Sequence, residues 1–170
     1  MDSYTKLAKN AVETYIKTGR IITPPSDLPP HMNRSAGIFV SIHTKDGKLR
    51  GCIGMIQPFG KTIAELIIEN AISAAVQDPR FFPVTEDELP LLVYKVDVLS
   101  VPRPVKNKKE LNPKKYGVIV STDDGRQGLL LPDLEGVESV DQQLDIACQK
   151  AGILKGEEYK IFKFTVERHQ

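Results

Sequence analysis

Four side chains that could do chemistry lie on either side of an Asp-Gly pair. Ser41 and His43 precede the pair, and Arg50 and Cys52 follow it. A cysteine attacks as its thiolate, and a nearby guanidinium favours that form. An imidazole can act as the base or orient a partner. If the two segments pair, they predict a thiol site with Cys52 as nucleophile or thiolate ligand, His43 as base and Arg50 as anion-binding group.

Residues 37–56 are typical of a β-hairpin, because two β-rich runs flank the Asp-Gly pair, a strong two-residue turn signal. A two-residue turn places Ser41 opposite Cys52 and His43 opposite Arg50. Side chains alternate between the faces of a strand, so all four polar groups share one face, with opposed Cβ atoms about 4.5–5.5 Å apart. A slip by one residue would separate them. The other face is apolar and carries Ile38, Val40, Ile42, Leu49 and Ile53.

Two glycines, Gly51 and Gly54, flank the thiol on the same strand. Glycine inside a strand weakens packing and often marks a bulge or the close approach of a backbone or ligand. We therefore expect them, with Ser41, to border a substrate. The alternative is structural. In that case Cys52 is a small buried hydrophobe, His43 lies on an ordinary exposed sheet face, and Arg50 pairs with a carboxylate and has no other role.

A second cluster is the segment Asp78-Pro79-Arg80-Phe81-Phe82-Pro83. It follows a predicted helix at 61–77, and its prolines stiffen the chain. We expect it to form a rigid wall of a pocket beside the hairpin, in which Asp78 orients Arg80 next to Phe81. The alternative is a helix-ending loop with a surface ion pair of little value. Glu69 and its neighbour Asn70 are polar among apolar residues of the helix and could point toward the same cleft.

The remaining elements suggest an internal duplication. The segment 37–41 resembles 117–121, and each copy leads to an Asp-Gly turn, a glycine-containing strand and a helix. The second copy has Gly128-Leu129-Leu130-Leu131 in place of Gly51-Cys52-Ile53-Gly54, which suggests that only the first half is specialised. We expect an α+β fold in which helices pack on an antiparallel sheet shared by two similar, intimately packed halves. The other predicted elements are helices at 3–18 and 139–151, strands at 91–99 and 159–166, and a second hairpin at 117–131.

Length and composition limit the class of protein. The 170 residues, 41% apolar and 26% charged, predict one domain over 1–170, with subdomains near 1–100 and 101–170 sharing one core. No apolar run approaches the ~20 residues of a membrane span. Two cysteines do not make a disulfide framework, and the absence of an apolar signal core favours the cytoplasm. We predict no metal, since His and Cys lack zinc-site spacing, and no cofactor, since Walker and Rossmann motifs are absent.

The loop at 103–115 is the one clear basic cluster. It suggests a minor possibility of RNA or acidic-partner contact. The net charge of +1 gives nucleic-acid binding no support.

The segment Leu49-Arg50-Gly51-Cys52-Ile53-Gly54 resembles the signature of the AMMECR domain family, whose prokaryotic members are called AmmeMemoRadiSam system protein A. The resemblance covers roughly residues 5 to 168. Its other matching segments are 37–41, 71–75, 78–83, 88–89, 128–132 and 148–152.

The resemblance implies an intracellular α+β protein with two unequal subdomains. It also implies a site at Arg50, Gly51, Cys52 and Gly54, joined by Asp78, Arg80 and Phe81. It brings no settled reaction, but it suggests Memo-type and radical-SAM proteins as partners. Two main hypotheses follow: a thiol-dependent enzyme acting on a small or nucleotide-like substrate, or a non-catalytic binding module. RNA contact through the basic loop is the third.

Overall fold

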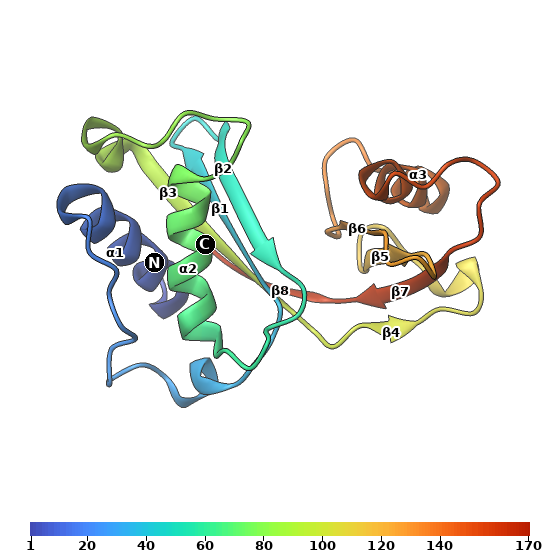
Figure 1. Cartoon of the computed structure of the whole chain (residues 1–170), viewed down its shortest axis with the longest axis horizontal. Coiled ribbons are helices and arrows are strands. Elements are labelled where there is room, and N and C mark those ends of the chain that lie inside the picture. Colours follow the sequence, from blue (N-terminus) through green and yellow to red (C-terminus); the bar gives the residue numbers. More distant parts are fainter. The chain divides into compact units, whose positions relative to one another are not determined.

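The computed structural model describes residues 1–170 and divides into two compact units (Figure 1). Unit 1 comprises Met1–Val98 and Glu167–Gln170, and unit 2 comprises Leu99–Val166. Each unit has its own cluster of buried apolar side chains. The helices of unit 1 are α1 (Ser3–Thr18), α2 (Ile63–Val76) and the short 3-10 helices η1 (Pro30–Asn33) and η2 (Glu86–Leu91); unit 2 has α3 (Val140–Ala151) and η3 (Lys108–Glu110).

The strands form two sheets of four, in the orders β2-β1-β3-β8 and β4-β7-β5-β6. The expected α+β fold with antiparallel strands is confirmed, but the expectation of one shared sheet is wrong. The first strand of each hairpin is bordered on both sides by strands of its own half, so each hairpin belongs to a separate sheet. The strands are β1 (Ile38–Thr44), β2 (Leu49–Met55), β3 (Leu92–Leu99), β4 (Arg103–Pro104), β5 (Gly117–Ser121), β6 (Gln127–Leu130), β7 (Lys160–Phe164) and β8 (Val166–His169).

The two sheets repeat one topology, as the duplication predicts. In each, a hairpin is followed by a helix and by a third strand that pairs antiparallel with the first strand of the hairpin. The single strand expected at 159–166 is instead divided into β7 and β8, which belong to different sheets. Thr165 interrupts them, and its amide donates to the hydroxyl of Ser100 at 2.9 Å.

In unit 1, α2 packs on β1 and β2, and α1 packs on α2 (Figure 1). The side chains of Ile38, Val40 and Ile42 are fully buried beneath these helices. Helix α2 begins with the predicted capping box, in which Thr62 and Glu65 bond each other's main-chain amides. Helix α1 is capped by the carboxylate of Asp2 rather than by Ser3. No helix of the protein combines the length and the apolarity that crossing a bilayer requires.

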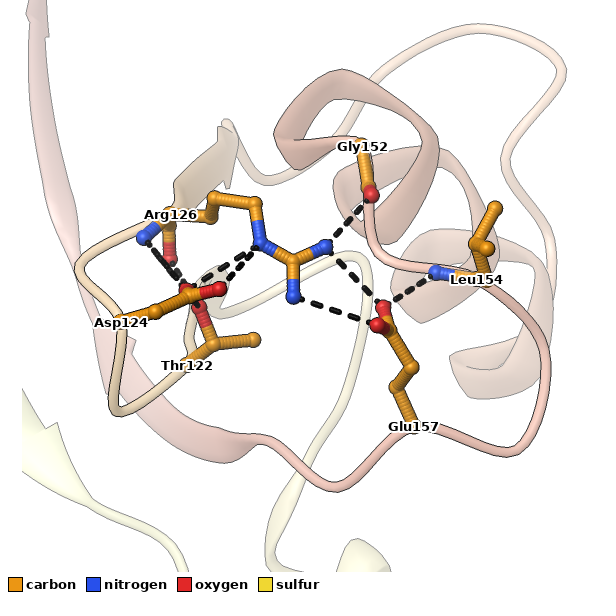
Figure 2. A network of polar contacts seen from close by, with 6 residues as sticks. All are labelled: Thr122, Asp124, Arg126, Gly152, Leu154 and Glu157. Carbon is orange, nitrogen blue, oxygen red and sulfur yellow. Dashed lines mark hydrogen bonds and ion pairs between the residues drawn. The ribbon is translucent and has the colours of Figure 1, made fainter.

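In unit 2, one arginine connects the hairpin turn to the end of α3. Figure 2 shows the guanidinium of Arg126 between the carboxylates of Asp124 and Glu157, with a further bond of 2.8 Å to the carbonyl oxygen of Gly152. Gly152 ends α3 in the left-handed conformation, as the sequence predicts. The network fixes the loop after α3 against the turn.

Candidate functional site

The strand register confirms one predicted pair and corrects the other. Ser41 lies opposite Cys52, but the register shifts between Ile42 and His43, so that His43 pairs with Leu49. Arg50 is the unpaired extra residue of a β-bulge, so the prediction that it faces His43 is wrong. A bulge adds one residue to one strand, which regular pairing from the turn does not include. The same shift leaves Leu49, expected on the apolar face, 38% exposed.

The second hairpin shows what the first would be without this residue. The threonine and aspartate of both turns form the same hydrogen bond, Thr44 with Asp46 and Thr122 with Asp124. Beyond the second turn, pairing continues without a shift. Aligned on their turns, the hairpins therefore differ by one inserted residue, and that residue is Arg50.

This alignment also adjusts the predicted repeat. The pair of Ser41 with Cys52 in the first hairpin occupies the position of the pair of Ile119 with Leu129 in the second. The resemblance between 37–41 and 117–121 is therefore displaced by two positions from the structural equivalence. A polar Ser–Cys pair still occupies the place of an apolar Ile–Leu pair.

The two glycines beside the thiol are explained by packing within the protein. A Cβ added at Gly51 would lie 2.1 Å from the carbonyl oxygen of Ala74 in α2. One added at Gly54 would lie 2.2 Å from the ring of Phe39. These contacts account for both glycines, and the expectation that they border a substrate stays a prediction. Gly128 meets the carbonyl oxygen of Ala147 at the same 2.1 Å in unit 2, so a strand glycine beneath the following helix belongs to the repeat.

The bulge residue is held by a carboxylate from η2. Arg50 donates from Nε and Nη2 to the two oxygens of Glu88, at 2.7 and 3.0 Å. These bonds hold the pKa of Glu88 at about 2, although burial opposes the shift. The Arg50 side chain is only 15% exposed, and its Nη1 is buried without a hydrogen-bond partner. One edge of the guanidinium, Nε and Nη2, is therefore occupied by a carboxylate, which is the pairing that the structural alternative predicts.

Asp78 connects the strand of Cys52 to a second guanidinium. Its Oδ2 accepts the main-chain amide of Cys52 at 2.9 Å, and both carboxylate oxygens accept from the Arg80 guanidinium at 3.0 and 2.7 Å. The Asp78 side chain is 2% exposed. The hydrogen bonds from Arg80, against the opposing effect of burial, hold the pKa of Asp78 far below its ordinary value. The carboxylate is therefore charged throughout the physiological range.

Arg80 is the cation that interacts electrostatically with Cys52. The hydrogen bond to Asp78 is the largest cause of the raised pKa of Arg80, burial opposes the shift, and the charge of Cys52 adds a smaller increase. Its side chain remains 56% exposed. The ring of Phe81 lies beneath both guanidiniums, 5.9 Å from Cζ of Arg50 and 5.5 Å from Cζ of Arg80.

The other predicted site residues have partners outside the Asp78–Arg80 cluster. His43 bonds the hydroxyl of Ser41, with 3.1 Å between Nε2 and Oγ. Glu69 is bound by the ammonium of Lys61 at 2.5 Å, and the amide of Asn70 donates to a strand carbonyl in the core. No group of three or more His, Cys, Asp and Glu side chains is placed to hold a metal ion.

Glu88 has a second role that the sequence does not predict. Its position three residues after Thr85 indicates a capping box, which the structure has. The ion pair of Glu88 with Arg50 joins residues far apart in sequence, so no local sequence pattern predicts it. The bulge did leave a local signal, since glycine in a strand is typical of a bulge and Gly51 follows Arg50 directly.

Comparisons with known proteins place this geometry in context. The AMMECR1 family model matches residues 5–169. A Thermotoga maritima protein is 50% identical over 169 residues, covering 98% of this chain and 97% of its own. A Clostridium acetobutylicum protein is 48% identical over 171 residues, and the match covers 99% of this chain but 36% of the longer relative. The crystal structure of an uncharacterized protein from Pyrococcus horikoshii matches with a TM-score of 0.89 and 35% identity, over 97% of this chain and 88% of the other.

Proposed function

The chain belongs to the AMMECR1 family, and for this member we propose a thiol-dependent enzymatic site in unit 1, where Cys52 attacks a small substrate that carries an anionic group. One observation carries the proposal. The buried carboxylate of Asp78 binds both the main chain of Cys52 and the guanidinium of Arg80. The backbone of Cys52 and the guanidinium of Arg80 are thus fixed by one buried carboxylate, and a cation held near a thiol favours the thiolate.

The anion-binding role expected of Arg50 is better assigned to Arg80. Glu88 occupies the fork of Arg50, and the side chain of Arg50 is largely buried. Arg80 is more than half exposed and uses Nε and Nη2 for Asp78, which leaves donors of its guanidinium for a ligand. A carboxylate or phosphate is the group that such donors bind best.

Alkylation with two probes of different charge tests this proposal. Iodoacetate and iodoacetamide transfer the same type of group, and the thiolate displaces iodide from both. We expect the ratio of the iodoacetate rate to the iodoacetamide rate to be higher at Cys52 than at Cys148, as read by peptide mass spectrometry. Arg80→Gln should lower the ratio at Cys52 severalfold and leave that at Cys148 unchanged. Equal ratios at both cysteines in the wild type would exclude an anion-attracting thiol site.

One observation favours the second candidate function, a non-catalytic binding module. Phe82 is 91% exposed between Phe81 and Pro83, and an exposed aromatic side chain on a stiff loop suits a protein partner. Memo-type and radical-SAM proteins are the partners that this proposal names. Phe82→Ala should then abolish copurification with such a partner while Cys52→Ser preserves cellular function. Loss of function in a folded Cys52→Ser variant would favour thiol chemistry.

The basic loop gains no support from the structure. Two of its five lysines pair with carboxylates of unit 2: Lys108 with Asp141 at 2.8 Å, and Lys114 with Glu138 at 3.4 Å. We therefore do not propose RNA contact.

A further inference from the structure

The sheet face that carries Cys52 holds a hydrogen-bonded hydroxyl–imidazole pair. Ser41 and His43 are both partly exposed, on the face opposite the buried side chains of β1. Nδ1 of His43 lies 3.3 Å from the carbonyl oxygen of Gly47, and Nε2 lies 3.1 Å from Oγ of Ser41. The turn and the strand together therefore hold the ring from both nitrogens.

These contacts determine which ring nitrogen carries the proton. A carbonyl oxygen only accepts, so Nδ1 of His43 bears the hydrogen and donates to Gly47. Burial, the largest cause, lowers the pKa of His43, while the bond to Gly47 opposes the shift. The imidazole is thus neutral at pH 7, and its Nε2 presents a lone pair. The hydroxyl of Ser41 donates to that lone pair, which is the arrangement of an activated hydroxyl.

The charged groups that face His43 come from the neighbouring strands. Lys95 of β3 and Arg168 of β8 lower the pKa of His43 further, and Asp97 of β3 raises it. The guanidinium of Arg168 is bound by Asp97 at 2.8 and 3.2 Å, so the opposite effects of these two residues on the pKa of His43 partly cancel. This environment keeps the imidazole unprotonated at pH 7, so a proton that it accepts can be held only by the attraction of the thiolate formed at the same time.

The position of Cys52 brings its thiol close to Ser41. Its amide points to Asp78 rather than to β1, so Ser41 and Cys52 form a non-hydrogen-bonded pair of the antiparallel ladder. In such pairs the Cα atoms lie about 4.5 Å apart, and the side chains approach more closely than in hydrogen-bonded pairs. The register therefore places the Cys52 side chain beside Ser41, on the sheet face where the hydroxyl of Ser41 bonds the imidazole of His43.

We propose that Ser41 and His43 form a proton relay that removes the proton from the Cys52 thiol. The thiol proton moves to Oγ of Ser41 while the proton of that hydroxyl moves to Nε2 of His43. A neutral thiol and a neutral imidazole become a thiolate and an imidazolium, so charge is balanced and no further reagent is needed. This inference rests on the proposed thiol function and names the base that serves it.

The test compares the pH profile of Cys52 alkylation by iodoacetamide in four proteins: wild type, Ser41→Ala, Ser41→Thr and His43→Gln. Free cysteine has a pKa of about 8.5. Wild type and Ser41→Thr, which keeps a hydroxyl, should both show a midpoint of the alkylation profile below this value. Ser41→Ala and His43→Gln should move the midpoint upward, so that the rate at pH 6.5 falls about tenfold for each pH unit of the move. An unchanged Cys148 profile and unchanged circular dichroism check the fold.

The outcomes separate this inference from the proposed function. A low wild-type midpoint that persists in both Ser41→Ala and His43→Gln but is lost in Arg80→Gln overturns the relay and keeps the thiol site. A wild-type midpoint no lower than that of free cysteine overturns both. A midpoint that rises in both Ser41→Ala and His43→Gln and is restored in Ser41→Thr supports the relay, whereas a rise in Ser41→Ala alone overturns it, because a hydroxyl that only bonds the thiolate needs no base.

Discussion

The main-chain amide of Cys52 donates a hydrogen bond of 2.9 Å to the side chain of Asp78, a carboxylate that is almost fully buried. The bond satisfies an amide on the edge strand of its sheet, where no neighbouring strand is available. Because Asp78 also holds Arg80, the edge of the sheet and the cation are fixed by one side chain.

Replacing Asp78 tests this connection. Asp78→Asn keeps the shape but removes the charge that binds Arg80, so we expect a loss of about 2 kcal/mol in the free energy of unfolding. Urea denaturation measures it. Asp46→Asn is the matched control, because that exposed carboxylate bonds only neighbours in its turn. Equal unfolding midpoints for wild type and Asp78→Asn would contradict the assigned role.

The Arg50–Glu88 pair predicts a pH dependence of stability. The folded-state pKa of Glu88 is about 2, below the ordinary value of about 4.3. Its contribution is therefore fully present above about pH 4.3 and is lost as the pH falls toward 2. Glu88→Gln should flatten the stability curve between these values and cost about 2 kcal/mol at pH 7. Parallel curves for wild type and variant below pH 4.3 would contradict the assignment.

The strand glycines predict unequal costs for the same substitution. In Gly51→Ala the new methyl group meets a main-chain oxygen of α2, so the helix must shift, and we expect about 3 kcal/mol of destabilisation. Gly128→Ala should behave alike in unit 2. Gly54→Ala meets the ring of Phe39, a side chain that can turn, and should cost less. Thermal unfolding of the three variants checks the order, and a larger loss for Gly54→Ala would contradict it.

Asp2 connects the beginning and the end of unit 1. It caps α1 through the amide of Thr5 and bonds His169, whose ring stacks on Tyr4 at 3.7 Å. Burial would raise the pKa of Asp2, but the bonds from Thr5 and His169 outweigh it and lower the pKa. Asp2→Ala should cost about 1 kcal/mol or more in urea denaturation, and Asp2→Asn less, because asparagine still caps. Equal losses would show that the cap contributes nothing.

Local sequence patterns predicted most of the helices and strands. The site depends on contacts between residues far apart in sequence, which local patterns do not predict. Turn chemistry, capping residues and periodicity placed both hairpins, all three α-helices and the pair of Ser41 with Cys52. The predicted register failed at Arg50, because counting pairs outward from the turn does not allow for the extra residue of a bulge. The partner of Arg50, Glu88, lies on a separate element, and only tertiary packing brings the two together. The close approach of α2 explains Gly51, for which the sequence could not distinguish a ligand from a helix.

The most direct test of the account compares the two cysteines of one molecule. Burial raises the pKa of Cys148, which the bond to Tyr159 offsets only in part, so its thiol should react slowly. The rates of alkylation by iodoacetamide at pH 7 are read from the two cysteine peptides of the folded protein. We expect Cys52 to react at least about tenfold faster than Cys148, the ratio that one unit of difference in pKa produces. A Cys52 that reacts no faster than Cys148 would contradict the proposed thiol site.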